Sequence, residues 1–275
     1  MTSDSSNNSY ECSGVRLDEM EALKERIKAF ASVTHGPEVL NAEGGFAGLY
    51  LLAGYKEPVL VASADGVGTK LKIAGHLGHY ESVGQDLVSL NVNDILTKGA
   101  KPIFFLDYVA FSELDDQLMD SLLRGIAWGC RETGCALIGG ETAQMPGLYR
   151  SKDLDLAGFV VGVAERNAVI DQREMIQRVF ARLKKASGRS PKGWLGPALA
   201  ETQDTVDWLH EAGFEYVADW VLDDQPVDLR TKNGTMVGLP YTQELNDLSM
   251  QLIQGHRATE YADRAIDEFD QLIKD

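Results

Sequence analysis

Cysteine, long apolar runs and positive charge are all scarce in this sequence of 275 residues. Its three cysteines, Cys12, Cys130 and Cys135, include no C-x-x-C pair and are too few for a disulfide framework. No apolar run approaches the ~18 to 20 residues of a membrane-spanning helix. The first ten residues are polar and acidic, whereas a signal peptide is basic and then apolar. We therefore expect a cytoplasmic protein with reduced thiols.

Basic residues are outnumbered, because 26 Lys and Arg face 42 Asp and Glu and leave a formal charge of -16. A surface of this sign repels nucleic acid and anionic membranes, so we expect neither as a partner. A small ligand that carries phosphate remains compatible, since backbone amides and a bound cation supply positive field locally. With 44% apolar residues, the chain can build one large core or two small ones.

Helix and strand patterns alternate in the first part of the chain. Apolar residues spaced by three or four predict a helix from Leu17 to Phe30. Apolar runs predict strands at 58–64, 103–110, 136–138 and 154–164, and helices are expected over about 80–99 and 115–133. Strands interleaved with helices favour an α+β fold, in which helices cover a sheet.

The sequence changes character near Asp171, which we interpret as a domain boundary. We expect a flexible arm over residues 1–14, a first domain over 15–172 and a second over 173–275. Three of the four tryptophans follow the boundary. Beyond it we expect helices at 173–187 and 202–212, each followed by glycine, strands at 215–221 and 237–240, and a closing helix that contains Tyr261, Ile266, Phe269 and Ile273.

The densest polar signal follows the strand predicted at 58–64 and reads SADGVGTK at residues 63–70. Its glycines let backbone amides approach an anion, its lysine adds charge, and an aspartate at a strand end can hold a divalent cation against phosphate oxygens. The spacing differs from the Walker pattern G-x-x-x-x-G-K-[ST], and G-x-G alone is weak evidence. A phosphate site and an ordinary turn both remain open.

Two further stretches carry polar groups in apolar surroundings. Asn91, Asn93 and Asp94 interrupt an apolar helix, and Asn91 and Asp94 lie on one helix face. That face is either solvated or used on a ligand, because burial without partners is costly. The stretch LIGGETA at 137–143 places small residues and Glu141 where a strand is expected to end. Asp65, Asp94 and Glu141 are together what a magnesium-nucleotide site needs.

These three stretches, with EGGFAGLY at 43–50, FFLDYVA at 104–110 and the segment 147–165, resemble the phosphoribosylformylglycinamidine cyclo-ligase family of purine synthesis. The resemblance covers about Val15 to Asp171. It implies an ATP- and Mg2+-dependent ring closure of formylglycinamidine ribonucleotide to aminoimidazole ribonucleotide. It also implies an α+β sheet domain that pairs with a second copy as a homodimer through an intersubunit barrel.

The resemblance assigns roles by matching positions. It implies catalytic roles for Asp65, Lys70, Asp94 and Glu141. It implies metal ligation by Asp65, Asp94 and Glu141. It implies nucleotide contacts for Gly44, Gly45, Gly66, Gly68, Thr69, Asn91, Gly139 and Gly140, the first two in a loop that resembles a mobile cover.

The second part departs from that family, which continues into another α/β domain with a D-I-T-G-G-type motif that is absent after Asp171. Residues 174–275 instead resemble the later part of polysaccharide deacetylases, in their allantoinase-like branch. The similar segments are RSPKGWLGP at 189–197, YVADWVLDDQPVDLR at 216–230 and LPYTQELND at 239–247. This resemblance implies a partial (β/α) barrel-like fragment.

The metal-binding segments of the deacetylases have no counterpart here, so we expect structural roles for Asp219, Trp220, Asp223, Asp224, Trp194 and Tyr241. The chain thus looks like a fusion between the front of one enzyme and the back of another. Three functions remain open: the ATP-dependent cyclisation, a non-catalytic ATP-binding or dimerisation module, and a deacetylase-like amidohydrolase fragment.

Overall fold

The computed structural model describes residues 17–40, 47–150, 153–222, 225–242, 250 and 254–272. The chain divides into two compact units, Met1–Ile170 and Asp171–Asp275, which are considered separately below. The arm expected over residues 1–14 lies outside the described residues. No described helix is both long and apolar enough to cross a bilayer.

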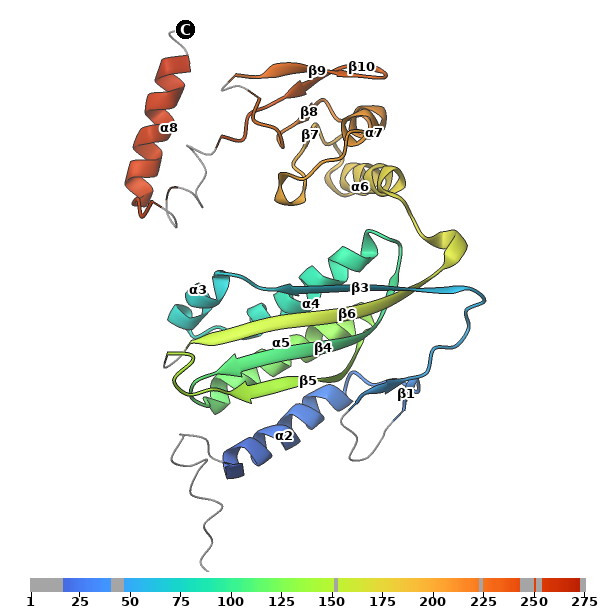
Figure 1. Ribbon diagram of the computed structural model, residues 1–275, viewed down its shortest axis with the longest axis vertical. Coiled ribbons are helices and arrows are strands. Elements are labelled where there is room, and N and C mark those ends of the chain that lie inside the picture. Colours follow the sequence, from blue (N-terminus) through green and yellow to red (C-terminus); the bar gives the residue numbers. More distant parts are fainter. Residues whose placement is uncertain are drawn as a thin grey trace, which may run out of the picture. The chain divides into compact units, whose positions relative to one another are not determined.

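Unit 1 is built on a four-stranded mixed sheet whose strand order is β3-β6-β4-β5 (Figure 1). Its strands are β3 (Pro58–Gly66), β4 (Lys101–Phe111), β5 (Ala136–Gln144) and β6 (Leu154–Glu165). Strands β4 and β5 are parallel, whereas β6 is antiparallel to both of its neighbours. All four predicted strands are confirmed, but β5 continues six residues beyond its expected end at 138. Glu141 is therefore inside a strand, because β5 keeps pairing with β4 through Gln144.

Two helices, α4 (Glu81–Leu96) and α5 (Asp116–Thr133), cover one face of this sheet (Figure 1). They approach closely, since a Cβ atom at Gly125 would collide with the backbone carbonyl of Glu81. The core between helices and sheet contains fully buried Leu87, Phe105 and Leu122. Burying each such side chain contributes about 1.5–3 kcal/mol. The helices predicted at 80–99 and 115–133 are thus confirmed.

Shorter elements complete unit 1. Helix α2 (Leu17–Ser32), which was predicted, packs on α5 and β5. The sequence pattern did not predict α3 (Lys70–Leu77), the two-residue strands β1 (Val39–Leu40) and β2 (Leu49–Tyr50), or the 3-10 turn η1 (Arg166–Ala168). Of these, α3 matters for the site, because it begins at Lys70.

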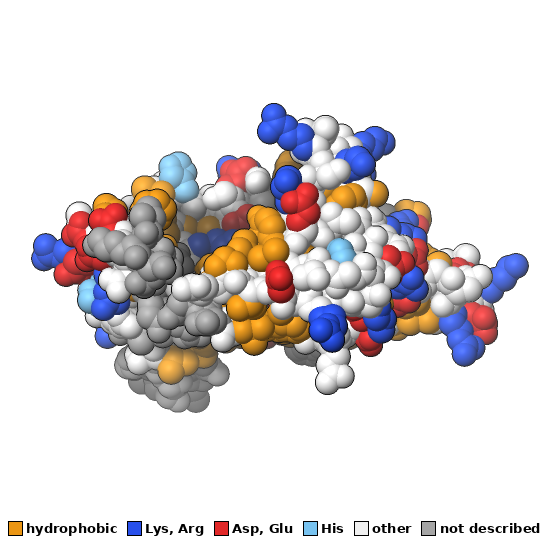
Figure 2. All heavy atoms as spheres, turned by 90° about the horizontal axis from the view of Figure 1, so that it is seen from above, with side chains coloured by type: hydrophobic (Ala, Val, Ile, Leu, Met, Phe, Trp, Pro, Cys, Tyr) orange, Lys and Arg blue, Asp and Glu red, His pale blue; other side chains and the backbone are white. Residues whose placement is uncertain are grey.

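The sheet face opposite α4 and α5 exposes apolar side chains. Leu60 on β3 is 61% exposed and Phe159 on β6 is 44% exposed. Phe159 pairs with Leu106 of β4, so the apolar row crosses from strand to strand. Figure 2 presents another side of the molecule, seen from above, where apolar side chains also lie between charged ones. Exposed apolar side chains on one face of a sheet can be buried by a partner.

Unit 2 contains a second four-stranded sheet, with the order β7-β8-β10-β9. Its strands are β7 (Gly193–Trp194), β8 (Tyr216–Val217), β9 (Val227–Thr231) and β10 (Gly234–Gly238). Its helices are α6 (Gln172–Ser187), α7 (Thr205–Ala212) and α8 (Ala258–Leu272), and a 3-10 turn η2 spans Pro197–Leu199. Strands β7, β8 and β10 are parallel, and β9 is antiparallel to β10. A buried cluster that includes Ile176, Leu209 and Phe214 joins α6, α7 and the sheet.

The structure corrects two details of the predictions for unit 2. The strand expected at 215–221 contains only Tyr216–Val217, because beyond it the side chain of Asp219 accepts the backbone N–H of Gly196. The helix expected at 202–212 begins at Thr205, since Thr202 donates its backbone N–H to the Thr205 hydroxyl. Parallel β7, β8 and β10 are compatible with a barrel fragment, which stays a prediction.

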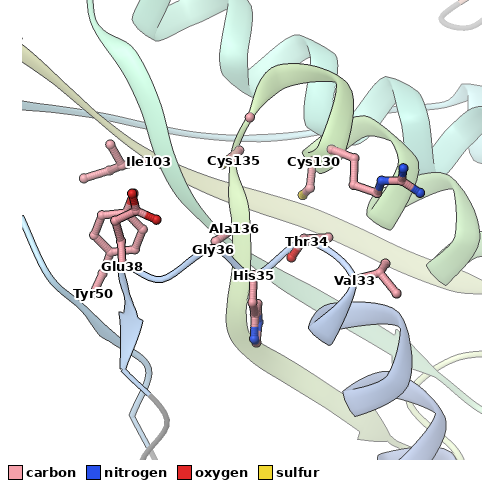
Figure 3. Close-up of a pocket in the computed structure, with 12 residues that line it drawn as sticks. Val33, Thr34, His35, Gly36, Glu38, Tyr50, Ile103, Cys130, Cys135 and Ala136 are labelled. Atoms are coloured by element: carbon pink, nitrogen blue, oxygen red, sulfur yellow. The ribbon is translucent and has the colours of Figure 1, made fainter.

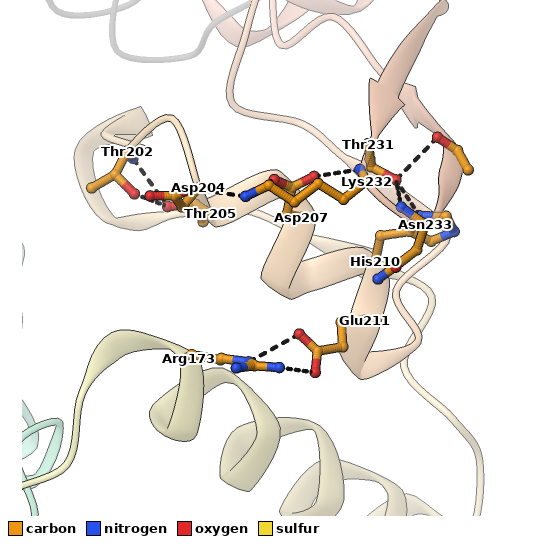
Figure 4. Close-up of polar contacts among 11 residues, drawn as sticks. Arg173, Thr202, Asp204, Thr205, Asp207, His210, Glu211, Thr231, Lys232 and Asn233 are labelled. Carbon is orange, nitrogen blue, oxygen red and sulfur yellow. Dashed lines mark hydrogen bonds and ion pairs between the residues drawn. The ribbon is translucent and has the colours of Figure 1, made fainter.

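Polar contacts tie α7 to its neighbours (Figure 4). Arg173 of α6 pairs with Glu211 of α7. Lys232 in the β9–β10 turn pairs with Asp204 at 3.1 Å and with Asp207 at 2.9 Å. The basic partners Arg173 and Lys232 are largely solvent-exposed, so each pair adds about 1 kcal/mol or less.

Candidate functional site

Asp65 and Asp94 lie near one another at the β3 edge of the unit 1 sheet. The hydroxyl of Ser63 on β3 donates to the Oδ2 atom of Asp94 on α4 at 2.6 Å. Asp65 follows two residues later on the same face of β3, about 7 Å along the strand. Its Oδ1 atom accepts the backbone N–H of Gly66 at 2.7 Å. Both carboxylates are exposed, so both are available to a ligand.

Asn91 has a different place from the nucleotide contact that was expected. It is fully buried in α4, and its Nδ2 atom donates to the carbonyl of Asp65 at 3.2 Å and to that of Leu87 at 2.9 Å. Its Oδ1 atom is buried without a partner among the described residues. Asn91 therefore fixes the end of β3, where Asp65 lies. It does not belong to the exposed face of α4.

Lys70 begins helix α3 directly after the glycine-rich turn. Its Nζ atom donates to the Oδ2 atom of Asp86 on α4 at 3.0 Å, and both side chains are about half exposed. Gly68 has a φ of +68°, which L side chains rarely adopt. Gly66 closes β3, and Thr69 precedes α3 without a side-chain capping bond. The turn is thus followed by a lysine whose partner in this structure is the half-exposed carboxylate of Asp86.

Glu141 lies elsewhere. One row of the sheet contains Asp65 on β3, Asp107 on β4 and Gly140 on β5, and Glu141 belongs to the next row. Because successive residues of a strand face opposite sides, Glu141 and Asp65 lie on opposite faces. Two strands separate β3 from β5, a span of roughly 14 Å. Within one chain the structure therefore does not bring Glu141 together with Asp65 and Asp94.

The donor chemistry at Asp65 and Asp94 fits magnesium. No group of three or more His, Cys, Asp or Glu side chains in the described part of the chain is arranged to hold a metal ion. Magnesium in nucleotide sites nevertheless takes one or two carboxylates and completes its shell with phosphate oxygens and water. Asp65 and Asp94 provide such a pair of exposed carboxylates.

A cavity of about 850 Å3 lies between α2 and β5. Gly139, Gly140 and Glu141 contribute to its wall, and Lys24 and Lys28 of α2 add positive charge. The three residues from β5 thus share a ligand-sized space, in contrast to Asp65 and Asp94. Gly44 and Gly45, which were expected to cover the nucleotide, lie outside the described residues.

Asp107 is a site residue that the sequence analysis missed. It lines the same cavity but is only 6% exposed. Its carboxylate lies over Gly140, where a Cβ atom would collide with its Oδ1 atom. Burial raises the pKa of Asp107 to about 7, and a hydrogen bond from its own backbone lowers it less. A single acid inside the apolar strand sequence IFFLDYVAF was the available signal.

A smaller cavity of about 270 Å3 lies at the other end of β5 (Figure 3). Cys130 and Cys135 line it, together with His35 and Tyr50. Contact with Cys135 and burial hold the pKa of the Cys130 thiol well above its usual range. A thiol of this kind is inert at neutral pH, so Cys130 is structural.

The fold and these residues define a mixed α/β domain with an acidic, glycine-rich site at the end of an edge strand. Residues 47–164 match the family described as AIR synthase related protein, N-terminal domain.

Relatives of known function match the same part of the chain. A phosphoribosylformylglycinamidine cyclo-ligase of Sorangium cellulosum is 54% identical over 167 residues, which are 60% of this chain and 48% of that protein. One of Methylobacillus flagellatus is 52% identical over 172 residues, which are 62% of this chain and 50% of that protein. The chain spans about half the length of the curated relatives it matches.

Solved structures show weaker similarity to this chain. Thiamine-monophosphate kinase from Stenotrophomonas maltophilia has 18% identity and a TM-score of 0.44, over 70% of this chain and 58% of that chain. Hydrogenase maturation protein HypE in complex with ATP has 17% identity and a TM-score of 0.41, over 54% of this chain and 42% of that chain.

Proposed function

We propose that unit 1 binds ATP with Mg2+ and serves the cyclisation of formylglycinamidine ribonucleotide to aminoimidazole ribonucleotide in purine biosynthesis. One observation carries this proposal: the 52–54% identity to cyclo-ligases runs through the stretch that contains Asp65, Asp94 and Glu141. The geometry supports it, because Asp65 and Asp94 are exposed carboxylates near the end of β3 and Lys70 directly follows the glycine-rich turn after that strand. Free, buried Cys130 and Cys135 are compatible with a reducing cytoplasm.

Each side chain has a role in this proposal. Asp65 and Asp94 would hold the metal ion, which neutralises phosphate charge when it is bound. Lys70 would exchange its partner Asp86 for a phosphate oxygen, and the backbone of Gly66, Gly68 and Thr69 leaves room for that approach. Asn91 positions Asp65 through the backbone. The protein's contribution is thus positioning and charge compensation rather than a nucleophile.

Glu141 would act from a second copy of the chain. It lies on the opposite face and opposite edge of the sheet from Asp65. The same sheet exposes Leu60 and Phe159, which a homodimer would bury. A pair of copies is therefore the arrangement in which Glu141 could face the Asp65 turn of a partner.

The experiment is isothermal titration of Mg-ATP into the full chain, with the mass in solution recorded on the same sample. Binding by a dimer supports the proposal, and Asp94→Ala should then weaken affinity at least about tenfold. Asp18→Ala, an exposed carboxylate of α2, is the matched control and should bind as the wild type does. No binding by a folded dimer would contradict the nucleotide site.

Two other functions give different outcomes. ATP binding without phosphate release in the presence of the ribonucleotide would favour a non-catalytic ATP-binding or dimerisation module. A deacetylase-like amidohydrolase fragment would show hydrolysis that chelators abolish and Asp65→Asn leaves unchanged. We favour the cyclisation, since the identity to cyclo-ligases concerns the part of the chain with the site.

A further inference from the structure

Two carboxyl groups of unit 2 meet where the parallel strands β7 and β8 end. Gly196 follows β7 and donates its backbone N–H to the Oδ1 atom of Asp219, which follows β8, at 2.6 Å. Glu201 reaches back to the same place, and its Oε1 atom accepts the indole N–H of Trp194 at 2.9 Å. Both carboxyl groups thus close the segment 195–204 onto the strand ends.

The two carboxyl groups are close to one another. A Cβ atom at Gly196 would collide with the Oε1 atom of Glu201 and lie 3.1 Å from the Oδ2 atom of Asp219. Asp219 is only 4% exposed, and its Oδ2 atom has no hydrogen-bond partner among the described residues. A proton on Glu201 would satisfy this atom, because the neutral carboxyl donates a hydrogen bond that a carboxylate cannot donate.

Other charged groups of the neighbouring helices have partners elsewhere. On α7, Asp207 faces Lys232 and Glu211 faces Arg173 of α6. His210 faces the hydroxyl of Thr231 at 2.6 Å. Asp219 is the ionisable neighbour that acts on Glu201, whose other polar contacts are Trp194 and Thr205. Burial and Asp219 raise the pKa of Glu201 to about 7.

The segment that these groups hold is strained. Leu199 has a φ of +55°, in the left-handed region that costs a branched residue free energy. Such a conformation persists only where surrounding contacts maintain it. Two such contacts are the hydrogen bond from Gly196 to Asp219 and the hydrogen bond from Trp194 to Glu201.

We propose that Glu201 and Asp219 share one proton and act as a pH-sensitive latch, which closes the segment 195–204 onto β7 and β8 while the proton is present. Glu201 binds this proton more tightly in the folded chain than in the unfolded chain. The latch therefore stabilises unit 2 at low pH, and its contribution is lost as pH rises through about 7. Above that pH two neighbouring carboxylates repel, and the segment opens.

Hydrogen exchange of the full chain, corrected for the intrinsic pH dependence, tests the latch. Protection of segment 195–204 should fall about tenfold between pH 6 and pH 8 in the wild type. Glu201→Gln keeps a neutral hydrogen-bond donor and should remain protected at both pH values. Glu215→Gln removes an exposed carboxylate that pairs with Lys192 and is the control, which should behave as the wild type does.

A direct titration keeps the test independent of any variant's folding. The 13C signals of the glutamate carboxyl groups of the wild type should include one that titrates near pH 7, and Asp219→Asn should shift that titration downwards. Trp194 fluorescence should follow the same midpoint, because its indole N–H is bonded to Glu201. Absence of a carboxyl titration near pH 7, or equal protection at both pH values in the wild type, would overturn the proposal.

Discussion

The side-chain amide of Asn91, buried in helix α4, donates to the backbone carbonyl of Asp65 at the end of strand β3. This bond joins the helix that carries Asp94 to the strand that carries Asp65. The distance between the two proposed metal ligands is therefore set partly by a fully buried residue. The fold of unit 1 and its site are coupled through this contact.

Replacement of Asn91 tests this coupling. Asn91→Leu should lower the free energy of unfolding by about 1–3 kcal/mol, because the carbonyl of Asp65 loses its buried donor. Urea unfolding of the full chain measures this change, and Mg-ATP affinity should fall as well. Asn93→Leu, at an exposed position of the same helix, should change stability by no more than about 0.5 kcal/mol. Equal effects of the two replacements would refute the role of Asn91.

The two adjacent glycines of β5 should respond differently to alanine. Gly140→Ala places a methyl group against the carboxylate of Asp107 and should destabilise unit 1 by about 1–3 kcal/mol. Gly139→Ala meets only Leu106 at an ordinary 3.4 Å and should be tolerated. Thermal unfolding of the two variants makes the comparison, and Asp107→Ala should partly rescue Gly140→Ala. An equally large loss for both glycines would contradict the steric reason.

Asp107 should make unit 1 less stable as pH rises. Its pKa lies near 3.8 in the unfolded chain and about 7 in the fold, so the folded chain binds more protons between these values. Its contribution is complete below about pH 4 and is lost as pH rises towards 7, by at most about 4 kcal/mol.

The measurement is the urea midpoint at which β4 and β5 unfold, monitored by hydrogen exchange at pH 5 and at pH 8. The difference between the two midpoints gives the loss of stability. Asp107→Asn should show a smaller fall between the two pH values than the wild type, whereas Asp18→Asn should show the same fall. If Asp107→Asn retains the full pH dependence, another group is responsible.

Lys70 and Lys72 provide a matched pair on helix α3. Lys70→Ala should weaken Mg-ATP binding about tenfold, because the charge beside the glycine-rich turn is lost. Lys72→Ala removes an exposed charge two residues further on and should have a much smaller effect. Calorimetry at a fixed salt concentration compares them. Indistinguishable affinities would show that general charge, not the position of Lys70, matters.

Most elements of unit 1 could be predicted because local pattern and tertiary structure agree there. The strand at 58–64 and the helix at 115–133 follow from apolar periodicity. The fold buries the same apolar residues, within the sheet or between the helix and the sheet. Helix α3 could not be predicted in this way, since it is short and follows a glycine-rich turn. Strand β5 was predicted too short, because Gly139 and Gly140 have low strand propensity but still pair with β4.

The candidate site was only partly accessible from the sequence. Motif spacing singled out Asp65, Asp94 and Glu141, but it carries no information about strand order. The order β3-β6-β4-β5 places Glu141 far from Asp65, and pairing puts it on the opposite face. The contacts of Asn91 likewise depend on how α4 packs against β3.

The sequence by itself determined the chemistry: an acidic chain, glycine-rich turns next to carboxylates, and alternating helices and strands in its first part. Tertiary structure alone decided which of these groups meet. Asp107 and Glu201 have raised pKa values because folding removes water from them, and Asn91 became a positioning residue because α4 buries it. The physical reason is that burial and proximity arise between residues distant in the chain, which local patterns do not encode.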